Sequence, residues 1–369
     1  MDRCSQSRVV PSFDDVSKAC KASISCKSKI QPDGSFLVET PTNERGCVDP
    51  RAVWLKQATD EDKIGKLDAL LAESGFYIDV DRKCKGNRDC KIVIKANISV
   101  ATFKEYKYYT DPALVDAVVD RLKGKGYTNV IVVEADSFRS HPDFIAKNLG
   151  YKTPVVNLSD EPRVPVMIDG KRVNLARRMV DADFIIDMPI MKNHHAMLIS
   201  GALKSMYGSL PDRDKYGLYH LKESGMGIEQ VTTIVNHATP VDFVIVDMIH
   251  TQHGNEIPTL GWASSNHFKA NLIAAGRDPL AVDTVFERKM GYKDGDSPIV
   301  KEERNFRGNM PAESIPILGG GLDKIPGWKG VDSWYSGLMT MAQDVTGMIK
   351  KTGFPFTLDF VERMIPKNV

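Results

Sequence analysis

Short apolar runs and amphipathic segments alternate along the chain from about residue 91 onward. The apolar runs are rich in Val and Ile, and they predict strands at residues 91–97, 129–136, 153–158, 184–190, 241–248 and 270–275. Between them, apolar positions at helical spacing predict helices at 113–123, 143–149, 227–237 and 279–290, and two of these follow Asp-Pro pairs typical of helix starts. This alternation predicts an α/β fold with a mostly parallel sheet and helices on both faces.

Two flanking regions depart from this alternation. Residues 1–50 are polar and predict little regular structure, whereas residues 51–80 carry apolar positions at helical spacing. After residue 330 the helical spacing returns and predicts an amphipathic tail, which either packs on the core or binds a membrane surface or a partner. We therefore divide the chain into a cysteine-bearing N-terminal extension with a helix (1–90), an α/β core (91–330) and a helical tail (331–369).

Charge and apolar content narrow the class of protein. The 369 residues carry a formal net charge of +1, which gives no electrostatic reason to expect nucleic acid as a partner. No apolar run approaches the roughly 20 residues that cross a bilayer. We therefore expect a globular protein without a transmembrane segment.

All six cysteines lie in the first 90 residues, and the pairs Cys20/Cys26 and Cys84/Cys90 share a six-residue separation. Disulfides stabilise segments with a small core of their own, and they persist in oxidising compartments. We therefore expect at least two disulfides and an extracytoplasmic location, periplasmic or secreted, with a signal peptide outside this numbering. The alternatives are free thiols in a cytoplasmic protein, or a metal or iron–sulfur site, which the lack of a Cys-x-x-Cys pair disfavours.

Candidate chemistry is concentrated in the middle of the chain, where seven of the eight histidines lie between His194 and His267. His194 and His195 follow Lys192 directly after an apolar run, and Lys204 lies a few turns further on. Such residues can hold a carboxylate or phosphate and move a proton. We predict Lys192, His194 and His195 as catalytic and Lys204 as substrate-binding, whereas the alternative is a solvated loop.

Further polar residues stand near the ends of predicted strands, where open α/β sheets bind their ligands. Asp247 closes one such strand and is predicted to be catalytic. Lys95, Asn97, His253 and Asp283 are predicted to bind the substrate.

The histidines also indicate a candidate metal site. Two adjacent histidines on a helix point about 100° apart and rarely bind one ion together. The site would therefore combine His194 with His220 and His253, with His250 and His267 as further candidates. The sequence does not identify a cofactor, and a divalent transition metal ion is the candidate.

The motifs of several common site types are absent from the sequence. No Gly-x-Gly-x-x-Gly follows the first core strand, and neither a Walker A motif nor a Gly-x-Ser-x-Gly elbow occurs. Dinucleotide or ATP binding of the usual kinds is therefore unsupported.

Seven short motifs occur in a fixed order between residues 94 and 283. They read Ile-Lys-Ala-Asn at 94–97, Asp-Ala-Asp-Phe-Ile-Ile at 181–186, Met-Lys-Asn-His at 191–194, Ala-Leu-Lys-Ser-Met-Tyr-Gly at 202–208, Val-Ile-Val-Asp at 244–247, Gly-x-x-x-Pro-x-x-Gly at 254–261 and Asp-Pro-Leu-Ala-Val-Asp at 278–283. In this order the chain resembles the family catalogued as domain of unknown function 362. The resemblance implies a fold and a site, with little about the reaction.

The chain departs from that family's pattern in several places. The family usually has Lys-Thr-His where residues 192–194 read Lys-Asn-His, and often Leu-Lys-Asn where residues 203–205 read Leu-Lys-Ser. Many relatives carry a ferredoxin-like domain with Cys-x-x-Cys motifs, so their absence here implies no built-in iron–sulfur cluster. A more distant similarity is to the lactate racemase family, whose enzymes attach a nickel-pincer nucleotide to lysine, and Lys192 or Lys204 would be the analogous position.

These patterns predict an enzyme that acts on a small anionic substrate by proton transfer, isomerisation or elimination, with or without a metal ion. Lys192 and Lys204 would hold the anion, His194 or His195 would act as base or metal ligand, and Asp247 would orient a ligand or bind the metal. The alternative is an exported protein that binds a metal ion, cofactor or anion without turnover. A homo-oligomer is compatible with both.

Overall fold

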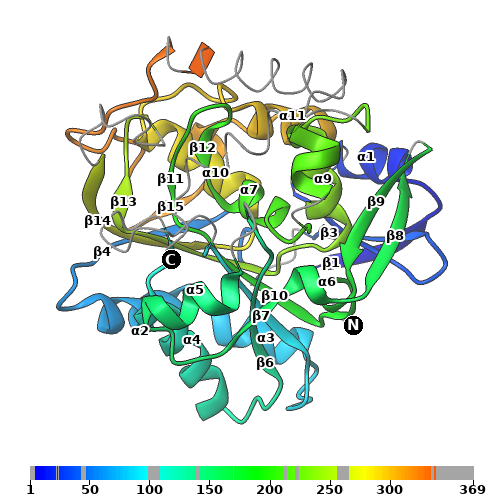
Figure 1. Cartoon of the computed structure of the whole chain (residues 1–369), viewed down its shortest axis with the longest axis horizontal. Coiled ribbons are helices and arrows are strands. Elements are labelled where there is room, and N and C mark those ends of the chain that lie inside the picture. The colour runs from blue at the N-terminus through cyan, green and yellow to red at the C-terminus, as the bar shows by residue number, and fades with distance from the viewer. Residues whose placement is uncertain are drawn as a thin grey trace, which may run out of the picture.

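The computed structural model describes residues 5–21, 23, 25–42, 47–98, 109–137, 141–168, 170–211, 214–220, 224–255, 266–333 and 336–337, without the side chains of residues 168, 216, 217 and 220. These residues form a layered α/β structure in which helices cover both faces of an eight-stranded sheet (Figure 1). The predicted fold class is confirmed.

The central sheet is mixed but mostly parallel. Its strands, in sheet order, are β15 (Ile317–Leu318), β4 (Val53–Gln57), β14 (His267–Gly276), β13 (Phe243–Gln252), β10 (Phe184–Met188), β5 (Ile92–Ala96), β6 (Val130–Glu134) and β7 (Val155–Asn157). The strands from β13 to β7 run parallel, β14 is antiparallel to both of its neighbours, and β15 is parallel to β4. The predicted strand at 270–275 is therefore present, and it is the one that runs against the others.

Each face of the sheet packs on its own set of helices. On β13, Val244, Val246 and Met248 join one apolar cluster, whereas Phe243 and Ile245 join the other, because side chains alternate along a strand. The second cluster includes side chains from α2 (Lys63–Glu73), α3 (Phe76–Lys83), α4 (Pro112–Gly124) and α5 (Pro142–Leu149), below the sheet in Figure 1. The first includes side chains from α1 (Phe13–Lys21), α6 (Arg177–Asp181), α7 (Ala202–Tyr207), α9 (Ile228–Ala238), α10 (Pro279–Lys289) and α11 (Pro298–Arg307).

Two helices begin at the Asp-Pro pairs that predicted them. The side chain of Asp111 accepts a hydrogen bond from the backbone N–H of Ala113 at 2.8 Å, and Asp278 accepts one from Leu280 at 3.0 Å. The proline that follows each aspartate lacks an N–H that the first turn would leave unpaired. The starts of α4 and α10 are thus confirmed.

The N-terminal extension contains more regular structure than its polar composition predicts. β1 (Ser5–Val10), β2 (Lys27–Ile30) and β3 (Phe36–Pro41) form an antiparallel sheet in the order β1-β3-β2. The expectation of little structure in residues 1–50 is therefore wrong. Alternate residues point inward in β2 and at the start of β3, and Phe36 and Val38 join the first cluster together with Phe13 and Val16 of α1.

Disulfides hold this region together. Cys20 is bonded to Cys26 and Cys84 to Cys90, and Cys47 is disulfide-bonded as well. None of the described cysteines is a free thiol. The expectation of at least two disulfides in the first 90 residues is confirmed, and the first of them joins the end of α1 to the segment that precedes β2.

Residues 51–80 differ from the prediction in their first part. The helices expected there are present as α2 and α3, but residues 53–57 form strand β4 between β14 and β15. A short apolar run fits one face of a helix and also fits a strand that is covered on both sides. Val53, Trp54 and Leu55 are all buried, as expected for a strand that is covered on both sides.

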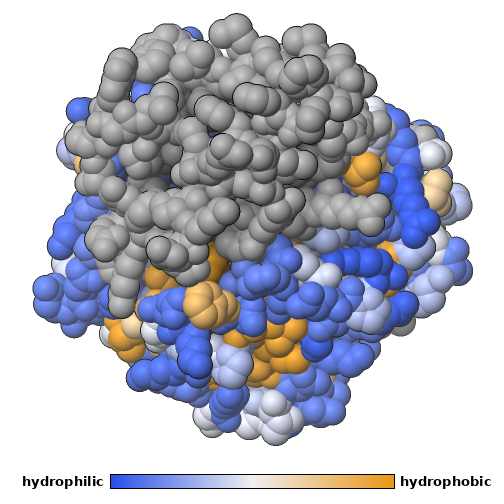
Figure 2. Space-filling model, in the orientation of Figure 1, coloured by the Kyte–Doolittle hydropathy of each residue, from blue (hydrophilic) through white to orange (hydrophobic). Residues whose placement is uncertain are grey.

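The remaining elements are short. β8 (Arg163–Ile168) and β9 (Lys171–Ala176) form an antiparallel hairpin, and single turns occur at η2 (Leu158–Asp160), η3 (Lys215–His220) and η5 (Ala312–Ser314). Where described residues reach the surface in Figure 2, hydrophilic side chains predominate and apolar ones form small patches.

The predicted tail lies outside the described residues from 338 onward. Within the described part, no helix is long and apolar enough to cross a membrane.

Candidate functional site

The predicted catalytic cluster lies on a small hairpin beyond the carboxyl end of β10. This hairpin consists of β11 (Lys192–His194) and β12 (Leu198–Ser200), and it leads directly into α7 (Figure 1). The exposed fraction is 8% for Lys192, 6% for His194 and 7% for His195. The alternative of a solvated loop is therefore wrong, and the cluster lies at the sheet edge where α/β proteins bind ligands.

The contacts of His194 determine which of its ring nitrogens carries the proton. Its Nδ1 accepts hydrogen bonds from the backbone N–H groups of Ala196 and Met197, both at 3.2 Å. The neutral ring must then carry its proton on Nε2. In this form Nε2 of His194 donates a hydrogen bond and cannot accept a proton as a base. The ring also stacks on that of His195, with centroids 4.5 Å apart.

Asn193 ties the hairpin to two distant parts of the chain. Its side chain is fully buried, and Nδ2 donates to the carbonyl oxygens of Gly254 at 3.0 Å and Lys329 at 2.8 Å. Its Oδ1 accepts from the hydroxyl of Tyr292 at 3.2 Å. A threonine hydroxyl, with a single proton, could not donate to both carbonyls. The departure from Lys-Thr-His therefore has a structural role in this chain.

A buried ion pair lies at the carboxyl ends of β5 and β6. The Nζ of Lys95 is 2.8 Å from Oε1 of Glu134, and both side chains are almost fully buried. The end of α7 lies directly against this pair, because a Cβ on Gly208 would be 3.0 Å from the Lys95 ammonium. Lys95 thus stands at the predicted edge, but Glu134 already offsets its charge.

Asp187 is a candidate acid that the sequence prediction did not include. It lies opposite Lys95 in the β10–β5 register, and its Oδ1 accepts a hydrogen bond from the hydroxyl of Ser205 in α7 at 2.6 Å. Its Oδ2 has no hydrogen-bond partner among the described residues. Burial raises the pKa of this carboxyl well above its usual value. The signal available in the sequence is a carboxylate inside an apolar run.

Asp247 is placed on the opposite face of the sheet. Its Oδ2 accepts from the N–H of Asp111 at 2.8 Å and its Oδ1 from that of Ile249 at 3.1 Å, so it faces the start of α4. Burial, with Asp111 as the next cause, raises the pKa of Asp247 to about 7. Asn97 is buried nearby, and its backbone pairs with Thr110. A catalytic role for Asp247 stays a prediction.

Asp283 lies in α10, and its side chain contacts the start of α7, where Lys204 lies. Asp283 accepts from the N–H groups of Ala202 at 2.7 Å and Leu203 at 2.9 Å, as a capping side chain would. A Cβ on Gly201 would be 2.2 Å from its Oδ1, so only glycine fits there. Lys204, the third residue of α7, is half-buried. Substrate binding by either residue stays a prediction.

The histidines predicted as metal ligands have different surroundings. His253 packs against Phe268 and Trp328, and its Nδ1 accepts from the backbone N–H of Lys329 at 3.2 Å. Burial is the largest cause that lowers the pKa of His253. The side chain of His220 lies outside the described residues, so the site of His194, His220 and His253 stays a prediction.

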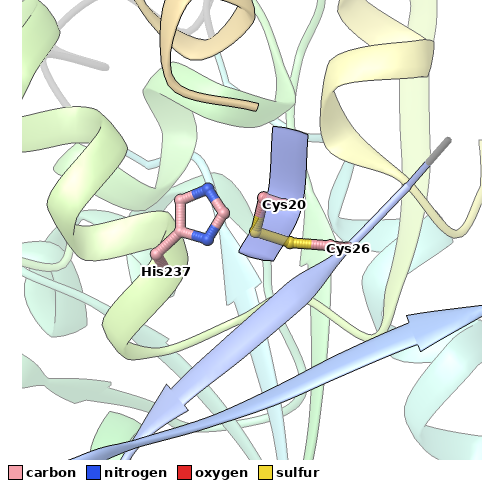
Figure 3. A group of neighbouring side chains, drawn as sticks. All are labelled: Cys20, Cys26 and His237. Carbon is pink, nitrogen blue, oxygen red and sulfur yellow. A yellow bond between two sulfur atoms is a disulfide. The ribbon is translucent and has the colours of Figure 1, made fainter. Parts of the chain in front are cut away.

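A different group of potential ligands surrounds the first disulfide. Ligand atoms of Cys20, Cys26 and His237 all lie within 4.8 Å of one another (Figure 3). The sulfurs are joined in a disulfide, however, and are not thiolates. The His237 ring contacts Ser28 at 3.1 Å and Glu303 at 2.8 Å, so this group packs α9 against the N-terminal extension.

A family model described as Domain of unknown function (DUF362) matches residues 92–288. A thylakoid-associated protein of Synechocystis sp. is 24% identical over 206 residues, which are 53% of this chain and 61% of that protein, so the chain spans less than two thirds of its length.

Among solved structures, the lactate racemase apoprotein from Thermoanaerobacterium thermosaccharolyticum is similar, with a TM-score of 0.38 and 14% identity over 69% of this chain and 59% of that one. The family match covers more than half of the chain and every motif from β5 to α10. The chain therefore belongs to the DUF362 family.

Proposed function

We propose that this protein is an enzyme that binds a small carboxylate or phosphate at the hairpin β11/β12 and moves a proton on it, in an isomerisation or an elimination. The observation that supports this most is the joint burial of Lys192, His194 and His195 at the carboxyl edge of the sheet. Burying charge-bearing groups costs free energy, and such groups gather at functional sites.

The roles follow from the contacts of each side chain. His194, with its proton on Nε2, would donate a hydrogen bond to an oxygen that gains negative charge, as a fixed neutral imidazole can. Lys192 and Lys204 would hold the anion, and His195 would act as the base. Asp187, whose pKa burial raises well above its usual value, would be a second source of a proton.

The first experiment tests turnover without a known substrate. The full chain is incubated in D₂O with a panel of 2-hydroxy acids, amino acids and phosphorylated hydroxy acids, and proton NMR follows the loss of each C–H signal. An enzyme of this class exchanges the transferred proton with solvent. Binding of a panel member without exchange would instead favour the alternative of a non-catalytic binding protein.

A pair of variants separates the chemistry of His194 from its structural contacts. His194→Asn keeps an acceptor for the two backbone N–H groups but removes Nε2–H. We therefore expect a near-normal melting temperature and an activity that falls by about 100-fold or more. His194→Ala also leaves buried N–H groups unpaired, at about 1–3 kcal/mol each. Full activity in His194→Asn would refute the donor role, and His141→Asn, at an exposed histidine, is the control.

We also propose an extracytoplasmic location, supported by the disulfides Cys20–Cys26 and Cys84–Cys90. Such bonds persist in oxidising compartments and are rare in the cytosol. Cell fractionation combined with alkylation of free thiols in the native protein tests this. Alkylated, reduced cysteines in a cytoplasmic fraction would contradict it.

A further inference from the structure

Two histidines and a carboxylate meet at the edge of the sheet formed by β4, β13 and β14, away from the α7 face. The Nδ1 of His250 lies 2.9 Å from Nε2 of His267, and Nε2 of His250 lies 2.6 Å from Oδ2 of Asp60. The two rings are nearly parallel, at an interplanar angle of 11°. The three groups thus form a chain of contacts from His267 through His250 to Asp60.

The backbone explains how the two rings come together. In the antiparallel pairing of β13 with β14, His250 lies opposite Lys269 and Gln252 opposite His267, so the histidines are diagonal neighbours on one face. The register shifts between Met248 and His250, as at a β-bulge, and bulges commonly re-aim a side chain. Both ligand positions are therefore on paired strands rather than on loops.

We propose that His250 and His267 bind a divalent transition metal ion between these two nitrogens, with Asp60 holding the His250 ring in place. The ion would replace the proton that the two imidazoles share. A carboxylate on the far nitrogen of a ligating histidine fixes its tautomer and raises its basicity. This site is separate from the hairpin β11/β12 and does not depend on the function proposed there.

The distance between the nitrogens indicates the kind of ion. With metal–nitrogen bonds of about 2.0–2.1 Å, two nitrogens 2.9 Å apart subtend an angle of about 90° at the metal. That angle suits adjacent positions of a tetragonal ion such as Cu²⁺ with nitrogen and oxygen ligands. The His250 side chain is 14% exposed and Asp60 is 41% exposed, so water or an anion can complete the shell.

The surrounding charges are compatible with a bound cation. Lys63 contacts Asp60 at 3.2 Å, but it also contacts Asp111 at 2.5 Å, which offsets its charge. Lys269 is 3.8 Å from Asp60.

Copper titration of the full chain tests the proposal. The protein is treated with a chelator, its disulfides are left intact, and Cu²⁺ is added at neutral pH while calorimetry gives the stoichiometry and electron paramagnetic resonance reports nitrogen ligands. We expect His267→Gln and His250→Gln each to lose one equivalent of Cu²⁺. Asp60→Asn should keep the site but bind about 10- to 100-fold more weakly. His141→Gln, at a histidine that is 67% exposed, should keep every equivalent.

Three outcomes would overturn the proposal. They are a wild-type protein that binds no Cu²⁺, an unchanged stoichiometry in His267→Gln, and an unchanged affinity in Asp60→Asn. Circular dichroism of each variant shows whether it is folded. If a histidine variant is unfolded, the more exposed Asp60→Asn still decides the question through its affinity.

Discussion

The clearest test of the packing around α7 is the substitution Asp283→Asn. Asp283 accepts hydrogen bonds from two backbone N–H groups at the start of that helix, and burial raises the pKa of its carboxyl from 3.8 to about 7. Asparagine has nearly the same shape, keeps one acceptor oxygen and does not titrate. The variant therefore removes one hydrogen bond and the pH dependence that this carboxyl contributes.

The magnitude follows from proton linkage. Between pH 3.8 and about 7 the folded protein binds a proton at Asp283 that the unfolded chain has released, so the free energy of unfolding falls as pH rises through this window. From pH 5 to pH 8 the wild type should lose about 2–3 kcal/mol from this group, at about 1.4 kcal/mol per pKa unit. Asp283→Asn should lose none of it, so the stability difference between the two proteins should be larger at pH 5.

Urea unfolding at pH 5 and pH 8, followed by circular dichroism, measures this difference. At pH 5, where the side chain at position 283 is neutral in both proteins, the lost hydrogen bond should cost about 1–3 kcal/mol. At pH 8 the wild-type carboxylate is ionised and buried, so its stability advantage should be about 2–3 kcal/mol smaller. Asp323→Asn, the same change at an exposed site, serves as the control for effects of pH on the method. A stability difference that is equal at both pH values would refute the reasoning, because it would mean that Asp283 does not bind its proton in the folded state.

Two further predictions concern stability. Replacing both Cys84 and Cys90 by Ser should lower the free energy of unfolding by about 2 kcal/mol, because the disulfide closes a short loop. Urea unfolding checks this, and an unchanged midpoint would contradict it. Gly208→Ala should cost about 1–3 kcal/mol, because a Cβ there would lie 2.8 Å from the Ser205 carbonyl oxygen. Calorimetry should show no such loss in Gly124→Ala, where nothing lies within 4 Å, and an equal effect at both sites would argue against close packing at the end of α7.

The fold of the core follows largely from periodicity. Strands buried on both faces appear as continuous apolar runs, and the Asp-Pro pairs at 111 and 278 mark helix starts with a side-chain acceptor. The prediction fails at β4 because the apolar residues Ala52, Trp54, Leu55 and Ala58 fit one face of a helix, and the same run also fits a strand covered on both sides. Direction is also invisible in such runs, so the antiparallel course of β14 could not be foreseen.

The sequence predicted where the candidate residues lie along the sheet, but not which face of the sheet each side chain points to. Lys192 and His194 stand beyond a strand end, as expected, but a shift of one residue along a strand reverses the face of a side chain. Asp187 therefore faces α7 while Asp247 faces the start of α4, although both occupy similar places in their runs. Local sequence patterns cannot predict contacts between residues that are distant along the chain, such as Asp60 with His250.

The hydrogen bonds of Asn193 to distant backbone carbonyls have a consequence for the order in which the chain folds during synthesis. Asn193 donates to the carbonyl of Lys329, which is synthesised 136 residues later. A chain emerging from the ribosome can pair β5, β10 and β13 early, but its hairpin β11/β12 stays untethered on that side until almost the whole described chain is made. A truncation after Leu318 but ahead of Lys329 would keep every strand of the central sheet and remove this contact of the hairpin.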